Sequence, residues 1–380
     1  MSEASSPLPV CIVGAGLAGL AAAHALTQAG VACVLLDKSR GVSGRAATRW
    51  RDVDGPAGPV RWRVDHGAQV FNPDPGSPAD RLARRVVGPD GVVEIGPPTI
   101  PFDDDGTVRP ERVRPGAPRL AFTGGYAALG RALADSAPGL DLRLDTSVTR
   151  LAFADGEWSV DASTPTGDAR LGPFRAVVMT PPGPQAADLV RASAFDPAVR
   201  DRLAQALAAA TYRSQWTVVL AFDEAVALPH GAYALVNAPA DAPAVDVDGD
   251  GVPARTPHGV AWLALESAKP GRAPRGASIL VAQMGAGWTQ AHYDDARETI
   301  ARQGRVVIET LAGPLPEPIW TDTQRWRYSL PDVAADAGAL AAAEALGLIV
   351  AGDAVAGKGR AHLALESGLD AAARIVARLG

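Results

Sequence analysis

"VCIVGAGLAGLAAAHAL", residues 10–26, contains an apolar run that stops at a glycine and continues as an alanine-rich segment. We expect a buried strand at residues 10–13 and a helix at 17–29, joined by a turn with glycines at 14, 16 and 19. The first glycine allows a tight turn, the second lets a diphosphate approach the backbone, and the third lets the helix pack on the strand. Free amides and the dipole at the helix start favour an anion. The stretch predicts a dinucleotide-binding unit.

The second apolar run, residues 31–36, ends at Asp37, 18 residues after Gly19. A carboxylate at this place can accept hydrogen bonds from both ribose hydroxyls of an adenosine, and it would repel a 2′-phosphate. The alternative is an ordinary βαβ unit with a glycine turn and a surface aspartate. The position of Asp37 favours a dinucleotide.

The length and composition are those of a folded globular protein of two or three domains. The chain has 380 residues, of which 47% are hydrophobic and 21% charged. Its formal net charge of −6 argues against nucleic acid or an anionic membrane as the main partner. No secretory signal and no long apolar run is visible, and both cysteines, Cys11 and Cys33, lie on expected buried strands. We therefore expect a cytoplasmic protein.

No metal is expected. "DVDGDG", residues 246–251, begins like a calcium-binding loop, but Pro257 stands where the loop needs a bidentate glutamate. The two cysteines have no further cysteine to complete a zinc site.

The C-terminal stretch "IVAGDAVAGKGRAHLALESGLDAAARI", residues 349–375, identifies the dinucleotide. An apolar strand ends at Gly352 and Asp353, and a glycine-containing loop leads into a helix expected at 361–378. The aspartate can hold ribityl hydroxyls, and the helix start can stabilise negative charge at the N1–C2=O edge of a flavin. In "GVSGRAATRW", residues 41–50, Gly44 and Arg45 can approach a phosphate, although a basic surface loop has the same composition. A cofactor that touches both ends of the chain must be long, which favours FAD over NAD.

With these motifs the chain resembles the flavin amine oxidase and glutathione-reductase-like FAD superfamily, and within it the bacterial renalases. The resemblance runs in order along nearly the whole chain, through "SGRAATR", "VDHGAQVF", "FTGGYAALGRALA", "KPGR", "LPEPIWTDTQRWRYSLPD" and "GKGRAHLALESG". The loops at 72–118 and 238–258 do not follow it.

The resemblance implies a Rossmann-like, glutathione-reductase-like FAD-binding domain with an inserted α+β substrate domain of the flavin amine oxidase type. We expect the FAD-binding domain at 1–71, 119–184 and 331–380, and the substrate domain at 72–118 and 185–330. From the residue pattern we expect a strand at 64–71, helices at 124–139 and 185–208, strands at 214–222, 259–267 and 277–285, and a helix at 292–312.

The same resemblance assigns the residues that bind FAD non-covalently. At the diphosphate and the adenosine they are Gly14, Ala15, Gly16, Leu17, Ala18, Gly19, Asp37, Lys38 and Val148. Beside the diphosphate and flavin they are Gly44, Arg45, Ala46, Gly67, Ala68 and Gln69. At the ribityl chain and the pyrimidine edge they are Gly352, Asp353, Arg360, His362 and Leu363.

Bacterial renalases oxidise the 2- or 6-dihydro isomers of NAD(P) by hydride transfer to flavin N5, and oxygen is reduced to H2O2. The resemblance therefore implies a dihydronicotinamide dinucleotide and oxygen as partners. Because the dihydropyridine gains aromaticity, no side-chain acid or base is required and none is assigned. For the substrate pocket we expect Tyr212, Trp216, Trp288 and Arg327, with His66, Trp326 and Tyr328 in neighbouring segments.

Two other functions remain open. An amine oxidase commonly carries a lysine on the substrate-domain strand that faces N5, whereas "SQWTVVLAF", residues 214–222, carries Thr217, and Lys269 lies in a later loop. A flavin-binding protein with a regulatory, non-catalytic role is the third hypothesis. The missing strand lysine weakens the amine oxidase reading.

Overall fold

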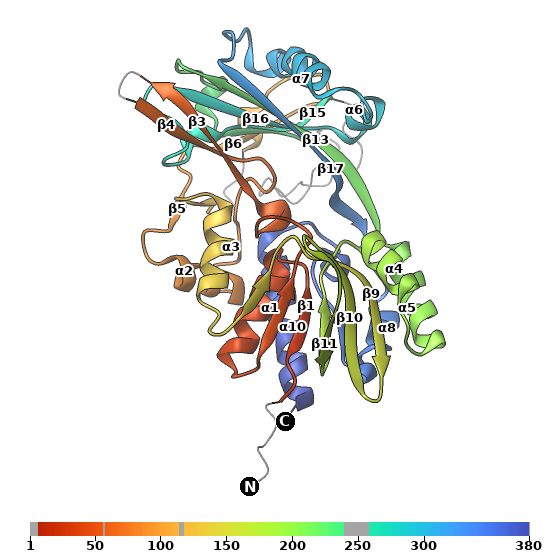
Figure 1. Cartoon of the computed structure of the whole chain (residues 1–380). Helices are drawn as coiled ribbons and strands as arrows, with labels where there is room; N and C mark the ends of the chain where they lie inside the picture. Colours follow the sequence, from red (N-terminus) through yellow and green to blue (C-terminus); the bar gives the residue numbers. More distant parts are fainter. Residues whose placement is uncertain (1–6, 56–57, 114–117, 239–257, 380) are drawn as a thin grey trace. The chain divides into compact units, whose positions relative to one another are not determined.

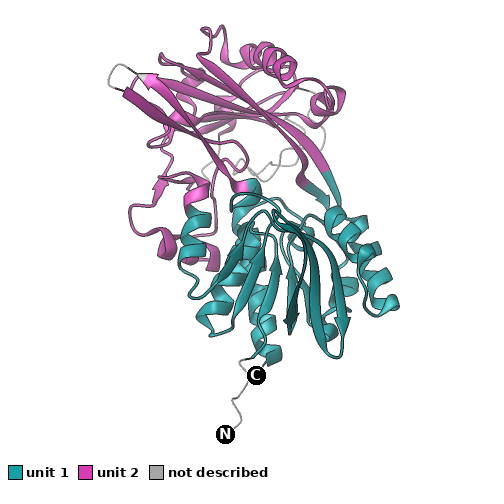
Figure 2. Cartoon of the chain, in the orientation of Figure 1, with its two compact units in different colours: residues 1–45, 129–212, 331–380 teal, residues 46–128, 213–330 magenta. Residues whose placement is uncertain are grey.

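The computed structural model describes residues 7–55, 58–113, 118–238 and 258–379, so the stretch 246–251 lies outside the described residues. The chain forms two compact units, shown in separate colours in Figure 2. Unit 1 comprises Met1–Arg45, Leu129–Tyr212 and Pro331–Gly380, and unit 2 comprises Ala46–Ala128 and Arg213–Leu330. Residues 46–71 and 119–128 thus lie in unit 2, and residues 185–212 lie in unit 1.

Unit 1 is built on a five-stranded sheet with the order β18-β12-β1-β2-β8, in which all neighbouring strands are parallel. The central strands are fully buried, as their unbroken apolar sequences predict. The first strand, the first helix and the second strand form as predicted from the opening sequence. The strands are β1 (Val10–Val13), β2 (Cys33–Leu36), β8 (Asp141–Arg143), β12 (Ala176–Met179) and β18 (Leu348–Val350).

An antiparallel three-stranded sheet and several helices complete unit 1. Helices α1 and α10 lie side by side, because Gly368 brings the backbone of α10 against the carbonyl group of Ala18 (Figure 1). The sheet consists of β9 (Ser147–Ala154), β10 (Glu157–Thr164) and β11 (Gly167–Phe174). The helices are α1 (Leu17–Gln28), α3 (Tyr126–Asp135, beginning in unit 2), α4 (Gly183–Ala192), α5 (Pro197–Ala209), α8 (Ala337–Ala341), α9 (Asp353–Ala356) and α10 (Ala361–Leu379).

The single helix expected at 185–208 is wrong: the structure has two helices there. Helix α4 ends before Ser193, and α5 begins anew with Asp196 as its N-cap and Pro197 in its first turn. The Asp196 side chain accepts a hydrogen bond from the amide of Val199 at 2.9 Å. An aspartate followed by proline is a strong helix start, so the break has a local cause.

Unit 2 is built on a six-stranded sheet with the order β17-β13-β16-β15-β14-β6. Its longest strand, β17, was not predicted from the sequence. The sheet strands are β6 (Thr99–Phe102), β13 (Thr211–Phe222), β14 (Ala234–Asn237), β15 (Val260–Leu265), β16 (Ser278–Met284) and β17 (Trp320–Val333). The remaining elements are β3 (Thr48–Gly55), β4 (Gly58–Asp65), β5 (Val92–Glu94), β7 (Leu120–Phe122), α2 (Pro78–Val87), α6 (Ala286–Ala291) and α7 (Arg297–Ala312).

The two faces of this sheet carry different partners, because successive side chains of a strand point to opposite faces. Trp216, Val218 and Leu220 of β13 share one core with Ile300 and Ile308 of α7. Val219 and Ala221 belong to a second core with Trp62 and Val64 of β4. We call these the α7 face and the β4 face.

The strand expected at 64–71 is wrong beyond its first two residues. Strand β4 ends at Asp65, and residues 66–70 form an irregular segment before an isolated bridge at Phe71. Within the described residues, no helix combines the length and the apolar character needed to cross a membrane.

Candidate functional site

The fold itself requires two of the three glycines of the first turn. Gly14 has φ +105°, and Gly19 packs so tightly that a Cβ atom would overlap the carbonyl oxygen of Gly14. Gly16 differs, because a Cβ built there meets no described atom within 4 Å. Gly16 is the N-cap of α1, and no described side chain caps this helix. The first-turn amides, including those of Leu17 and Ala18, therefore have no side-chain cap and suit an anion.

Asp37, at the end of β2, is connected to this turn. Its Oδ2 accepts the amide hydrogen of Ala15 at 2.6 Å, and its Oδ1 accepts that of Ser39 at 2.7 Å. Its own carbonyl accepts a hydrogen bond from the amide of Thr146 at 2.8 Å, two residues before Val148 on β9. Val148 thus lies two residues along the chain from a hydrogen-bond partner of Asp37, whereas Lys38 is exposed in the loop that follows Asp37.

The loop of residues 41–45 meets the glycine turn through a residue that the sequence did not reveal. Ser43 has φ +81°, donates its amide hydrogen to the carbonyl of Ala15 at 2.8 Å, and forms an isolated bridge with Gly16. A Cβ atom at Gly44 would lie 3.4 Å from the Cα atom of Gly16. Gly44 and Gly16 therefore lie against one another; their contact with the diphosphate stays a prediction.

Asp353 is held by two residues for which the sequence indicated other roles. Arg45 Nη1 lies 2.5 Å from Asp353 Oδ2, and the Tyr212 hydroxyl donates to Asp353 Oδ1 at 3.1 Å. Burial, followed by the negative charge of Asp353, raises the pKa of Tyr212. Arg45 was expected at phosphate and Tyr212 at substrate, and in the structure both orient the predicted ribityl aspartate.

The remaining predicted cofactor residues of unit 1 lie at the N-cap of α9 and around the start of α10. Gly352 has φ +98°, and its amide donates to Ser367 Oγ at 2.9 Å. His362 and Leu363 lie in the first turn of α10, Arg360 immediately precedes the helix, and all three are half-buried. The helix start predicted to face the flavin is therefore present.

In unit 2, the predicted flavin segment, residues 66–69, lies on the β4 face of the sheet. Thr217 Oγ1 donates to the carbonyl of His66 at 3.0 Å, and Gln283 Nε2 donates to the carbonyl of Gly67 at 2.6 Å. The Trp326 indole donates to Thr217 Oγ1 at 3.1 Å and stacks on the His66 ring, with centroids 5.2 Å apart. Gln283 was missed from the sequence, although a glutamine in an apolar strand was the available signal.

His66 is neutral at physiological pH. Burial, followed by the positive charge of Arg49, lowers the pKa of its imidazole from 6.5 to about 4. Its Nδ1 atom is buried and makes no hydrogen bond with the described residues, and the same holds for Gln69 Oε1. Buried polar atoms normally have partners, so these atoms mark a place for a ligand or water.

The four predicted pocket residues have different surroundings within their own units. Trp216 is buried in the core on the α7 face, and Trp288 packs against that same core. Arg327 is exposed, with its guanidinium 5.3 Å from the ring centre of Tyr328. Tyr212 lies in unit 1 beside Asp353. The side chain of Trp216 points to the α7 face, whereas that of the next residue, Thr217, points to the β4 face, because neighbouring side chains of a strand alternate.

These features fit FAD. Unit 1 offers an open first helical turn at Gly16, a ribose acceptor at Asp37 and a pre-oriented Asp353, while Ala46, Gly67, Ala68 and Gln69 lie in unit 2. Among the described residues, no group of three or more histidine, cysteine, aspartate or glutamate side chains is arranged to hold a metal ion.

Known proteins agree with this reading of the fold. A likeness to solved structures covers nearly the whole chain. A putative protoporphyrinogen oxidase from Exiguobacterium sp. 255-15 superposes with a TM-score of 0.74 at 15% identity, covering 99% of this chain and 100% of that one. Cyclohexylamine oxidase from Brevibacterium oxydans superposes with a TM-score of 0.70 at 16% identity, covering 98% of this chain and 99% of that one. Reduced UDP-galactopyranose mutase superposes with a TM-score of 0.72 at 12% identity, covering 98% of this chain and 96% of that one.

Sequence relatives are similar over a short segment. The L-amino-acid oxidase of Naja atra is 44% identical over 67 residues, which are 18% of this chain and 12% of that enzyme. The L-amino acid oxidase of Cerastes cerastes is 41% identical over 69 residues, which are 17% of this chain and 13% of that enzyme. The chain thus matches only about an eighth of the length of these two relatives.

Two family descriptions match the chain itself. Residues 12–86 match the NAD(P)-binding Rossmann-like domain. Residues 104–376, well over half of the chain, match the flavin containing amine oxidoreductases. The chain therefore belongs to the flavin containing amine oxidoreductase family, with FAD as its cofactor.

Proposed function

We propose that this protein is an FAD-dependent oxidase of the 2- or 6-dihydro isomers of NAD(P), with oxygen as the electron acceptor and H2O2 as product. Bound FAD supplies the hydride acceptor and the route of electrons to oxygen. We assign binding of the dinucleotide part of FAD to unit 1 and binding of substrate to unit 2.

The observation that carries the proposal is the identity of the residue on β13 where an amine oxidase commonly has a lysine. Thr217 stands there, fully buried, and its hydroxyl is engaged by His66 and Trp326. The chain has three lysines, and two of them, Lys38 and Lys358, are exposed in unit 1. Lys269 is fully buried, with its Nζ atom 2.6 Å from Glu266 Oε2. None of the three lysines lies on β13.

The residues around Thr217 suit a substrate that needs alignment and no base. Oxidation of a dihydropyridine ring yields an aromatic ring, so no side chain has to remove a proton. The neutral His66 stacks on Trp326, and Thr217 and Gln283 bind the backbone of residues 66 and 67, so the side chains in direct contact there are uncharged. Holding a planar ring in one orientation supplies much of the acceleration that such a reaction requires.

Oxidation of an amine is the second candidate function. The matched segments of the L-amino-acid oxidases and the fold shared with cyclohexylamine oxidase favour it. Peroxide formation by the holoprotein separates the two candidates. We expect peroxide from the 2- and 6-dihydro isomers of NAD(P) and none from L-amino acids, cyclohexylamine or putrescine; peroxide from an amine alone would support the second candidate.

A further inference from the structure

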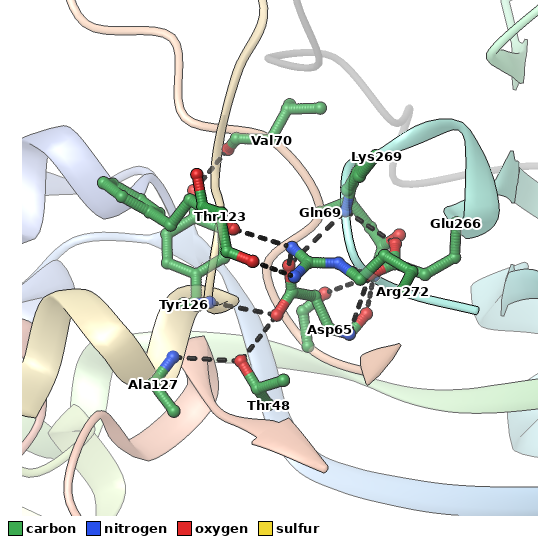
Figure 3. A network of polar contacts seen from close by, with 12 residues as sticks. Thr48, Asp65, Gln69, Val70, Thr123, Tyr126, Ala127, Glu266, Lys269 and Arg272 are labelled. Carbon is green, nitrogen blue, oxygen red and sulfur yellow. Dashed lines mark hydrogen bonds and ion pairs between the residues drawn. The ribbon is translucent and has the colours of Figure 1, made fainter. Parts of the chain in front are cut away.

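Four buried charged residues of unit 2 form a cluster beside residues 66–69 (Figure 3). We call Asp65, Glu266, Lys269 and Arg272 the buried charge cluster, and none of their side chains is more than 1% exposed. Arg272 donates to Asp65 Oδ2 at 2.6 Å and to Glu266 Oε1 at 2.8 Å. Lys269 Nζ lies 2.6 Å from Glu266 Oε2 and 3.6 Å from Asp65 Oδ2. The residues "KPGR", 269–272, supply both cations.

The charges of the cluster balance, since two carboxylates face two cations. Burial alone would raise the pKa of Asp65, but Lys269 and Arg272 outweigh it and bring this pKa below its usual value. Burial alone would lower the pKa of Lys269, but Glu266 outweighs it and the pKa is raised. A buried cluster of this kind stabilises a fold no better than apolar residues of the same volume. Its distinctive property is that directed hydrogen bonds fix geometry.

The geometry that the cluster fixes is that of Asp65, the last residue of β4. Its Oδ1 accepts the hydroxyl hydrogen of Thr48 at 2.6 Å and the amide hydrogen of Tyr126 at 3.0 Å. Its own amide donates to Glu266 Oε1 at 3.0 Å, and its carbonyl accepts a hydrogen bond from Gln69 Nε2. Every polar group of Asp65 is therefore engaged, immediately before the segment 66–69.

Further contacts hold the segment along its length. Thr217 and Gln283 bind the carbonyls of His66 and Gly67, and the Tyr126 hydroxyl donates to the carbonyl of Val70 at 2.6 Å. Within the part of the chain that the structure describes, the amides of residues 67–69 donate no hydrogen bond. The carbonyls of His66 and Gly67 are thus used internally, while the amides of residues 67–69 remain for another molecule.

We propose that the buried charge cluster is a positioning device, which sets the backbone of residues 66–69 so that the amides of this segment meet the flavin ring. The inference rests on the proposed contact between residues 67–69 and FAD. Lys269 and Arg272 act through Asp65 and do not touch the reacting atoms. The function of the "KPGR" motif is therefore to orient the flavin-facing segment, and Lys269 is not a catalytic amine.

The test uses purified holoprotein and needs no substrate, so its result is independent of the substrate class. Arg272→Lys keeps the charge but removes the forked contacts to Asp65 and Glu266. The double variant Glu266→Gln, Lys269→Met keeps the net charge at zero and removes the other ion pair. Ile308→Ala is the matched control, because it opens a cavity on the α7 face and destabilises unit 2 without contacting residues 65–70.

We expect both cluster variants to change the visible circular dichroism of bound FAD and to raise the Kd of FAD about tenfold, the effect of one lost hydrogen bond. Ile308→Ala, compared at an equal fall in Tm, keeps the wild-type spectrum and affinity. Cluster variants that change neither quantity more than Ile308→Ala does would overturn the proposal. Gln69→Leu distinguishes the positioning role of the cluster from the contact between residues 67–69 and FAD. If Gln69→Leu alters the spectrum and the cluster variants do not, the positioning role is refuted. If none of the variants alters the spectrum, the contact with FAD is refuted as well.

Discussion

The hydroxyl of Thr217 donates a hydrogen bond to the carbonyl of His66 at 3.0 Å and accepts one from the indole of Trp326 at 3.1 Å. One side chain of β13 thus fixes both a backbone group of the predicted flavin segment and an aromatic ring of β17. A lysine at this position could not accept the indole hydrogen while charged. Thr217 is therefore a structural connection between the sheet and residues 66–69.

Thr217→Val should lower the free energy of unfolding by about 1–3 kcal/mol, because it leaves a carbonyl and an indole N–H without their partner in a buried place. Thr217→Ser keeps the hydroxyl and should lose less than half as much. Urea unfolding of the two variants measures the difference. Equal losses in both variants would show that the methyl group, rather than the hydroxyl, carries the stabilisation.

Two of the three glycines of the first turn should respond differently to the same substitution. Gly19→Ala places a Cβ atom into the Gly14 carbonyl and should lower the Tm of the apoprotein strongly. Gly16→Ala meets open space, so the apoprotein should keep a nearly unchanged Tm while its affinity for FAD falls at least tenfold, since the new methyl group takes the place of the diphosphate. Differential scanning calorimetry and FAD titration measure the two effects. Gly16→Ala with unchanged FAD affinity would contradict the assignment of the diphosphate to this turn.

Asp37→Ala should raise the Kd of FAD by about 10- to 150-fold, equivalent to about 1.5–3 kcal/mol for charged hydrogen bonds to the ribose. The apoprotein should also lose some stability, because Asp37 accepts the amides of Ala15 and Ser39. Asp141→Ala, on the exposed neighbouring strand β8, is the control and should bind FAD as the wild type does. Full flavin occupancy of purified Asp37→Ala would mean that this carboxylate does not hold the ribose.

The buried His66 should make stability depend on pH between about 4 and 6.5. In this window the folded imidazole is neutral because burial lowers its pKa to about 4, whereas the unfolded imidazole binds a proton below 6.5. The unfolded state therefore binds more protons, and the free energy of unfolding rises with pH, by about 1.4 kcal/mol per pH unit at the steepest point. Above 6.5 this contribution is constant.

His66→Gln removes the titrating group and should flatten the slope across that window, as measured by urea unfolding at pH 4.5, 5.5, 6.5 and 7.5. His258, whose pKa burial also lowers, remains in the variant and in the wild type. Parallel pH profiles for the two proteins would show that His66 titrates normally in the folded state.

Local patterns in the sequence predicted the dinucleotide-binding half well. The alternation of β1, α1 and β2 follows from apolar runs, glycines and Asp37, all within one short stretch. The same kind of reasoning failed at residues 66–71, where the alternating pattern of a strand is present. There the carbonyls of His66 and Gly67 bind side chains of β13 and β16, more than 140 residues away, in place of a neighbouring strand.

Local sequence patterns also could not decide which side chains of β13 face β4. Trp216 and Thr217 are adjacent, and the register of β13 alone decides which of them faces β4. That register depends on pairing with β16, in which Thr217 lies opposite Gln283. The buried charge cluster was equally hidden, because Asp65 and Arg272 are 207 residues apart.

The most direct test of the proposed function is anaerobic stopped-flow mixing of the holoprotein with candidate substrates, followed by the absorbance of the flavin near 450 nm. Micromolar 2- or 6-dihydro-NAD(P) should bleach the flavin within seconds, while the 4-dihydro form and ordinary amines act far more slowly, because the site around Thr217 aligns a planar ring and offers no strand lysine. Admission of oxygen should restore the colour and produce H2O2. Rapid bleaching by an amine, with no response to the dihydronicotinamide isomers, would contradict the account and identify an amine oxidase.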